Sequence, residues 1–324
     1  MTRLGVTIGL DDTRAAEWAS AAAVVSRALR VFGEVDVTPT NSELPAALAS
    51  RRPDVVFQAA RGANDRVRTA VTLEQLGIPF TGSSSSALTL TASRERMKEA
   101  LGTRLIPTAV FTVARGPEDL VPLTRRSFPL VVFRASEVFD GRDCVVVEDA
   151  AELEREVHKL WATAPHPVLV ERYLPGSAFG CLVLGNGADR VVLPPVSLVS
   201  GSNPGESPSI DHVPEGLREG VERVVLETCR VLDLRDLARV DIALSERGVP
   251  HVLSADPLPD LTGDLSNPVL LAADSTGLDQ VELIQRTLHV AAARAGVPLP
   301  TSPMFDDLRY RTPPRGLRLR ARHA

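Results

Sequence analysis

The sequence has almost no lysine, few cysteines and no long apolar run. Of its 36 basic residues only Lys98 and Lys159 are lysine, so chemistry that needs several lysines has at most two. The 3 cysteines form no Cys-x-x-Cys pair, which argues against a disulfide framework or a zinc ribbon. No stretch of about eighteen apolar residues is present, and we therefore expect no membrane-spanning helix.

Several catalytic motifs are also missing. The sequence contains no G-x-G-x-x-G after its first apolar run, no G-x-x-x-x-G-K-[ST], no H-E-x-x-H and no G-x-S-x-G. The 6 histidines form no pair at metal-ligand spacing, so solvation explains each of them better than catalysis does. These absences leave the acidic residues on predicted strands as the best chemical signal.

The charge distribution bears on partners and compartment. A formal net charge of −5 gives no support to a nucleic-acid partner. The arginine-rich segment 297–324 is expected to be a disordered, solvated tail. Asp11 and Asp12 follow the first apolar run too soon for a signal peptide. Together with the lone cysteines, this favours a cytoplasmic protein without a membrane partner.

The order of the apolar segments predicts three α/β units in series. Residues 1–90 alternate short apolar runs with helical periodicity, which is typical of a Rossmann-like parallel sheet. A Ser/Thr-rich stretch from Ser83 is expected to separate this unit from the next. Residues 91–170 and 171–296 are richer in antiparallel patterns and predict mixed α/β units. In the third unit, 238–245 and 250–257 predict a hairpin.

Two acidic residues lie on the strands of this hairpin. Asp241 is in the middle of the first strand, and Asp256 is near the end of the second. An acid within an apolar strand is costly unless it is paired or bound to a metal. Two facing carboxylates could hold Mg²⁺ together with substrate phosphates. Alternatively, Asp241 pairs with Arg239 or Arg235, and the sequence leaves both interpretations open.

Seven segments, in this order and spacing, resemble those of one enzyme family. They are PDVVF at 53–57, LGIPFTG at 76–82, IPT at 106–108, FPLVV at 128–132, VLVERYLPG at 168–176, LARVD at 237–241 and LSADPLP at 253–259. Over about residues 1–296 the chain resembles the D-alanine–D-alanine ligases of the ATP-grasp superfamily, as a diverged member. The resemblance implies an ATP-grasp fold and an ATP-dependent carboxylate–amine ligation through an acyl phosphate.

The resemblance also assigns roles to individual residues. Lys98 matches a lysine that contacts phosphate, Glu171 an acid beside the adenine, and Leu174 the hinge that pairs with the base. Arg239 matches the arginine that stabilises the oxyanion, and Asp241 matches a magnesium ligand. The implied cofactors are ATP and Mg²⁺ if the site is functional, and none if it is not.

Other positions of the nucleotide site depart from the family pattern. The second phosphate-contacting lysine is replaced by Phe133, for which the neighbouring Arg134 could compensate in part. The glycine-serine loop over the phosphates becomes 135–143, which has one glycine and three acids. The Glu-x-Asn pair of metal ligands falls on Ser254 and Asp256, so one bridging carboxylate is missing. These changes leave room for one Mg²⁺ rather than two.

The substrate side has diverged as well. Asp65 is the best match for an acid in the second loop, and Glu17 is a candidate for the acid that holds a substrate ammonium. The tyrosine- and lysine-bearing lid of the family corresponds to 200–214, which contains neither residue type. D-Ala–D-Ala specificity is therefore not expected. A small amino-acid-like ligand and a homodimer are what the resemblance implies.

Three functional hypotheses remain. The first is an inactive or weak ligase homologue that acts by binding, in which Phe133 and Phe139 fill the nucleotide cleft. The second is an active ligase with a changed amino-acid substrate. The third is ATP-independent chemistry that uses Arg239 with the remaining candidates of the old cleft, namely Arg61, Asp65, Asp256, Asp260 and Asp264.

Overall fold

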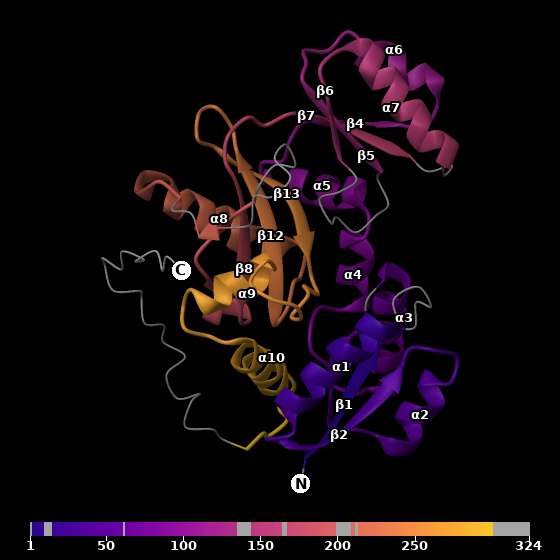
Figure 1. The fold of residues 1–324 in the computed structure, drawn as a ribbon, viewed down its shortest axis with the longest axis vertical. Helices are drawn as coiled ribbons and strands as arrows, with labels where there is room; N and C mark the ends of the chain where they lie inside the picture. The colour runs from indigo at the N-terminus through magenta and orange to yellow at the C-terminus, as the bar shows by residue number, and fades with distance from the viewer. Residues whose placement is uncertain are drawn as a thin grey trace, which may run out of the picture.

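The computed structural model describes residues 2–9, 15–60, 62–134, 144–163, 167–198, 209–210 and 213–300. Three sheets follow one another along the chain, each with its own helices (Figure 1). Within the described residues, no helix is both long and apolar enough to cross a membrane.

The N-terminal unit is built on a parallel three-stranded sheet in the order β2-β1-β3. Its strands are β1 (Thr2–Ile8), β2 (Gly33–Pro39) and β3 (Val55–Ala59), and its helices are α1 (Ala15–Leu29), α2 (Leu44–Arg51), α3 (Ala63–Leu76) and α4 (Ser85–Thr91). The parallel pairing confirms the expected α/β layer. The stretch from Ser83 is not merely a separator, because Ser84 caps α4 by accepting from the N–H of Ala87.

The central unit is an antiparallel four-stranded sheet in the order β4-β7-β5-β6. Its elements are α5 (Arg94–Gly102), β4 (Phe111–Ala114), the 3-10 turn η2 (Pro117–Asp119), α6 (Leu120–Leu123), β5 (Leu130–Arg134), β6 (Val145–Val147), α7 (Ala150–Thr163) and β7 (Val168–Arg172). Helix α7 covers one face of the sheet, where Leu153 and Val157 pack with Leu130 and Val132.

The C-terminal unit has the strand order β11-β10-β8-β12-β13, with β9 paired to β8. Its elements are β8 (Ala178–Leu184), the 3-10 turn η3 (Gly187–Asp189), β9 (Val191–Val192), β10 (Val196–Ser197), β11 (Ser209–Ile210), α8 (Glu215–Val231), β12 (Leu237–Leu244), β13 (Pro250–Asp256), α9 (Pro268–Asp274) and α10 (Gln280–Ala295). The β12–β13 hairpin confirms the sequence prediction.

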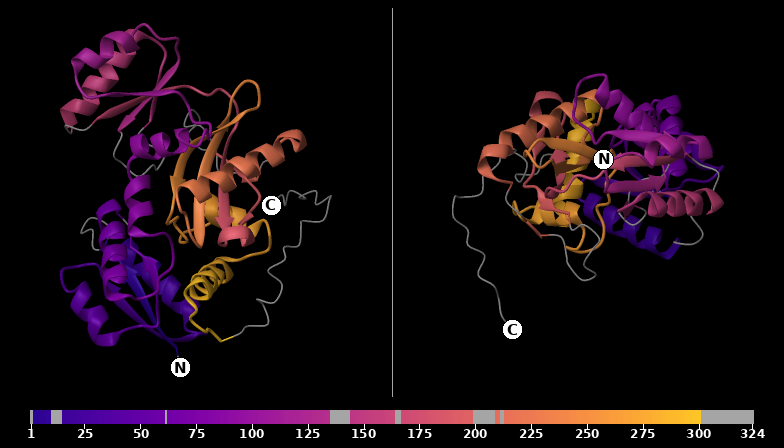
Figure 2. Two further views of the ribbon diagram at one scale, coloured as in Figure 1. Left: turned by 180° about the vertical axis from the view of Figure 1, so that it is seen from behind. Right: turned by 90° about the horizontal axis from the view of Figure 1, so that it is seen from above.

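The first and third units share one hydrophobic core. Helix α10 lies beside α1 (Figures 1 and 2), and its Leu283 and Leu288 belong to the same core cluster as Val25 of α1 and Leu184 of β8. The long sequence separation between α1 and α10 is therefore bridged by apolar packing.

A buried carboxylate joins the same two units. The side chain of Asp236 is fully buried and accepts hydrogen bonds from the Arg294 guanidinium, the Asn186 amide and the Gly82 backbone N–H, at 2.8–2.9 Å. Asp236 has a φ of 64°, in the left-handed region that non-glycine residues rarely adopt. Three hydrogen-bonding partners from separate segments hold it in this conformation.

Candidate functional site

The first group of candidate residues lies between α5 and β7. Helix α5 buries one face, and Lys98 on that face places its Nζ 2.9 Å from Oε1 of Glu171 on β7. Both side chains are buried. Burial lowers the pKa of Lys98, and the neighbouring Glu171 carboxylate offsets this only in part. The two residues that the resemblance assigns to phosphate and adenine therefore contact each other.

A second basic residue of α5 lies next to this pair. Arg94 is one helical turn before Lys98, and its guanidinium lies 4.3 Å above the centre of the Phe133 ring. Burial lowers the pKa of Arg94, while the carboxylates of Glu171 and Asp241 act in the opposite direction. The structure thus brings a cation to the face of Phe133, the residue that the resemblance matches to the second phosphate-contacting lysine.

Arg134 lies on the other side of the central sheet. Residues alternate between the two faces of a strand, so Phe133 and Arg134 of β5 point in opposite directions. Arg134 donates to the hydroxyl of Thr163 at the end of α7, at 2.8 Å. The structure does not bring Arg134 to the face that carries Phe133. Leu174 is half-buried in the segment between β7 and β8.

The second group lies on the β12–β13 hairpin. Arg239 donates through Nε and a terminal nitrogen to both carboxylate oxygens of Asp241, at 2.7 and 3.1 Å. Ser254, opposite Asp241 in the register, adds a hydrogen bond of 2.9 Å. Burial tends to lower the pKa of Arg239, but Asp241 outweighs this and raises it. The pairing of Asp241 with Arg239, which the sequence left as an alternative, is present.

Asp256 is paired with a residue that sequence reasoning did not single out. It lies opposite Arg239 at the end of β13, and it accepts from the Arg66 guanidinium of α3 at 2.9 Å. Its Oδ1 also accepts from the Leu258 backbone N–H at 3.0 Å. Helical spacing could have revealed Arg66, because positions 66, 69, 70 and 73 all lie on the buried face of α3.

The other acidic candidates make local contacts. Asp65 is in the first turn of α3, and its carboxylate lies 3.8 Å from the guanidinium of Arg68 in the same helix. Asp260 accepts from the backbone N–H and the hydroxyl of Thr262, and Asp264 accepts from the N–H of Ser266. These bonds are typical of loop geometry.

Some sequence-predicted positions fall outside the described residues. Glu17 belongs to α1, but the structure does not describe its side chain. Asp11, Asp12 and Arg61 also lie outside the described residues. The loop 135–143 with Phe139, the end of the tail from 301, and all of 200–214 except 209–210 and 213–214 are outside too. The expectations for these positions stay predictions.

The donor set at the hairpin does not fit a pair of magnesium ions. Magnesium is bound by free carboxylate oxygens together with phosphates and water. Here both oxygens of Asp241 accept from Arg239, and Asp256 accepts from Arg66. No group of three His, Cys, Asp or Glu side chains within the described ranges could hold a metal ion. The positions of both candidate ligands carry arginine–carboxylate pairs instead.

Known proteins resemble the chain in sequence over most of its length. No protein-family model matches the chain. D-alanine–D-alanine ligase from Cupriavidus pinatubonensis is 29% identical over 283 residues, covering 83% of this chain and 84% of that protein. The ligase of the same name from an Anaeromyxobacter species is 30% identical over 289 residues, covering 84% and 91%.

A solved structure supports the same conclusion for the fold. D-alanine–D-alanine ligase from Bacillus anthracis, complexed with ATP, superposes with a TM-score of 0.78 at 22% identity and covers 91% of this chain and 99% of that one. The fold is therefore the ATP-grasp fold, with a parallel N-terminal sheet and two antiparallel sheets. By sequence and by fold, the chain belongs to the D-alanine–D-alanine ligase family, as a diverged member.

Proposed function

We propose that this protein is inactive or weak as a ligase, and that it acts by binding a small amino-acid-like ligand. The observation that carries the proposal is the internal pairing of the residues assigned to nucleotide and metal. Lys98 is paired with Glu171, Asp241 with Arg239, and Asp256 with Arg66. Lys98 and the two carboxylates assigned to Mg²⁺ are thus each paired with another side chain.

The energetics of the Lys98–Glu171 pair support weak nucleotide binding. Separating a buried ion pair leaves an uncompensated charge, which costs about 3–5 kcal/mol when one partner is removed. A phosphate that recruits Lys98 away from Glu171 must offset a comparable cost. Each ~1.4 kcal/mol corresponds to about a tenfold loss of affinity. The replacement of the second lysine by Phe133 removes a further contact.

Calorimetry with ATP and Mg²⁺ tests the proposal. The wild-type protein should show no micromolar nucleotide binding and release no ADP in the presence of amino acids. Phe133→Lys restores a cation at the position of the missing lysine and should increase the affinity for nucleotide, whereas Phe133→Leu is the matched control for loss of the ring. Micromolar binding of ATP by the wild-type protein would overturn the proposal.

The second candidate is an active ATP-dependent carboxylate–amine ligase with an altered amino-acid substrate. Two observations favour it. The side chain of Arg239 is 24% exposed, so it can still meet a reacting group, and Arg94 supplies a buried cation beside Phe133. Phosphate release over a panel of amino acids and dipeptides would support this candidate. If such activity were unaffected by Asp241→Asn or Lys98→Ala, another site would have to be responsible.

A further inference from the structure

The four strands of the central sheet pack with α6 and α7 but share no apolar core with the rest of the molecule. We call residues 111–172 the central module. Within the described residues, the two apolar clusters that contain residues of this module contain none from outside it. In Figures 1 and 2 the module projects beyond the other two units, with α5 at its base.

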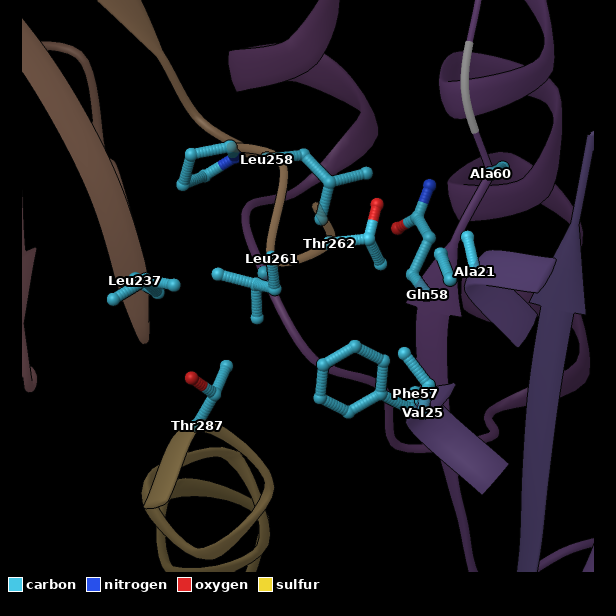
Figure 3. Close-up of a pocket in the computed structure, with 13 residues that line it drawn as sticks. Ala21, Val25, Phe57, Gln58, Ala60, Leu237, Leu258, Leu261, Thr262 and Thr287 are labelled. Carbon is cyan, nitrogen blue, oxygen red and sulfur yellow. The ribbon is translucent and has the colours of Figure 1, made fainter. Parts of the chain in front are cut away.

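The boundary between the first and third units is apolar, in contrast. Figure 3 shows Val25 and Phe57 of the first unit around a small cavity with Leu237 and Leu261 of the third. All four side chains belong to one core cluster. Because large apolar interfaces hold domains in a fixed arrangement and small polar ones do not, we expect the first and third units to form one body to which the central module is attached separately.

Helix α5 lies between this body and the central module. Met97 and Leu101, on one side of α5, belong to the core cluster of the C-terminal sheet. The adjacent side carries Arg94, Glu95 and Lys98, which helical spacing places next to one another. These three residues form what we call the polar seam. Helix α5 is thus anchored in the third unit by apolar packing and meets the central module through charged side chains.

The two cations of the polar seam contact one face of the central sheet. Lys98 forms its ion pair with Glu171 of β7, and its Nζ lies 5.8 Å from the centre of the Phe111 ring, which is opposite Glu171 in the register. Arg94 lies above the Phe133 ring of β5. Contacts of this kind depend on distance and orientation rather than on apolar area, so a small displacement of the module breaks them together.

The third contact of the polar seam lies at its solvent-exposed end. Glu95 pairs with Arg115, which directly follows β4 and has an exposed side chain. Water and salt screen such a pair, so it contributes little to the stability of the fold. Its removal therefore weakens the polar seam without touching Lys98 or Arg94.

We propose that the central module opens from α5 as a rigid body, and that the polar seam holds it closed in the absence of any ligand. Opening brings Lys98 and Glu171 into contact with water. A ligand that uses either group binds only the open fraction of the protein, and its affinity is reduced by that fraction. The inference goes beyond the proposed function, because the polar seam acts with no ligand bound.

Acetylation of lysine tests the opening, because the chain has only two lysines. The side chain of Lys98 is fully buried, whereas that of Lys159 is exposed and serves as an internal reference. With a water-soluble acetylating reagent and mass spectrometry of peptides, Lys98 should react about ten- to a thousandfold more slowly than Lys159, as expected for a minor open state. Below the unfolding transition this rate should change little with urea, because the opening exposes little surface.

A pair of matched variants tests the role of the polar seam. Arg115→Gln removes the exposed pair with Glu95 and should speed up the acetylation of Lys98 about two- to fivefold. Arg126→Gln is the control, because this exposed arginine donates to the Thr112 hydroxyl within the module. Its loss should leave the acetylation rate of Lys98 unchanged.

A third variant removes a buried part of the polar seam. Arg94→Met deletes the cation above Phe133 and should speed up the acetylation of Lys98 about three- to thirtyfold. The rate at Lys159 should be the same in all proteins. Circular dichroism melts report whether each variant is folded, and Arg115→Gln keeps the test decisive if Arg94→Met does not fold.

Three outcomes would overturn the inference. The first is acetylation of Lys98 as fast as that of Lys159. The second is a rate at Lys98 that rises with urea as steeply as global unfolding does, since Lys98 would then react only in the unfolded chain. The third is an equal rate in folded Arg115→Gln and Arg126→Gln. Micromolar ATP binding by the wild-type protein, together with faster acetylation in Arg115→Gln, would instead overturn only the proposed function.

Discussion

At the scale of single residues, the two lysines of the chain have opposite environments. Lys98 is buried against Glu171, whereas the side chain of Lys159 is 68% exposed and lies 3.2 Å from Glu156 on the surface of α7. Surface pairs of this kind contribute little to stability, because water and salt screen them. Buried pairs are costly to break but not necessarily stabilising compared with apolar residues. Because the chain has only two lysines, Lys98–Glu171 is its one buried lysine–carboxylate pair among the described residues. The contribution of this pair to stability can therefore be measured by itself.

The Lys98–Glu171 pair predicts strong coupling between its members. Lys98→Met and Glu171→Leu should each lower the free energy of unfolding by about 3–5 kcal/mol, because each removes the ion-pair partner of a buried charge. The double variant should recover most of that loss. Urea denaturation of the four proteins gives the coupling, and Lys159→Met is the matched control that should behave as wild type. Additive losses in the double variant would show that the pair is not coupled.

At the scale of elements, α8 packs on the C-terminal sheet with a cysteine among its buried valines. Cys229 of α8 and Cys181 of β8 belong to one core cluster with Val225 and Val240. Burial raises the pKa of the Cys229 thiol to about 12, and it raises that of Cys181 beyond the ordinary thiol range. Both thiols are therefore protonated in the folded protein at pH values where the unfolded chain ionises.

This difference predicts a loss of stability at alkaline pH. The unfolded thiols lose their protons near pH 8.5, so the folded state binds more protons above that value and its stability falls as pH rises. Below about pH 8.5 both thiols are protonated in the folded and the unfolded chain, so they cause no loss of stability there. Between there and about pH 12, each thiol should lower the free energy of unfolding by about 1.4 kcal/mol per pH unit.

Urea denaturation under reducing conditions from pH 7.5 to 10.5 checks the alkaline effect. The Cys181→Ala/Cys229→Ala protein should be less stable at neutral pH, because its core loses volume. Its free energy of unfolding should nevertheless depend less steeply on pH than that of the wild type. Identical slopes for the two proteins would contradict the assignment to these thiols.

Much of the secondary structure could be predicted from the sequence, but only part of the candidate site could. The alternating pattern located the β12–β13 hairpin, since a hairpin depends on local pattern. Helix α4 was missed because serine and threonine read as loop residues until one of them acts as a cap. The sequence placed Arg239 and Asp241 on one strand. The pairing of Asp256 with Arg66, 190 positions away, depends on tertiary packing that local pattern does not report.

At the scale of the whole molecule, the Asp236 cluster joins the first unit to the third. Gly82, Asn186 and Arg294 come from distant segments and meet at one fully buried carboxylate. The side chain of Arg294 is the only cation among these three partners of Asp236, and it also donates to the Phe80 carbonyl. Loss of this guanidinium leaves Asp236 charged without a counter-ion.

Arg294→Ala should therefore be among the most destabilising single changes in α10. We expect a loss of about 3–5 kcal/mol in the free energy of unfolding, because a buried charge becomes unpaired. Arg294→Lys keeps the charge but not the planar guanidinium. Its free energy of unfolding should lie between those of the wild type and Arg294→Ala. Thermal and urea denaturation measure the effect, with Arg235→Ala, from a partly exposed pair with Asp233, as the control. Equal stability of Arg294→Ala and Arg235→Ala would contradict the role of the cluster.

The shared core of α1 and α10 also has a consequence during synthesis on the ribosome. The apolar face of α1 is covered in part by Leu283, Ile284 and Leu288 of α10, which are translated long after α1. At about 5–20 residues per second, roughly 15–60 seconds pass between the first strand and this helix. The nascent N-terminal unit must wait that long with its apolar surface uncovered. A chain that ends before α10 should therefore be more open to proteolysis in its first 80 or so residues, and more dependent on chaperones, than the complete one.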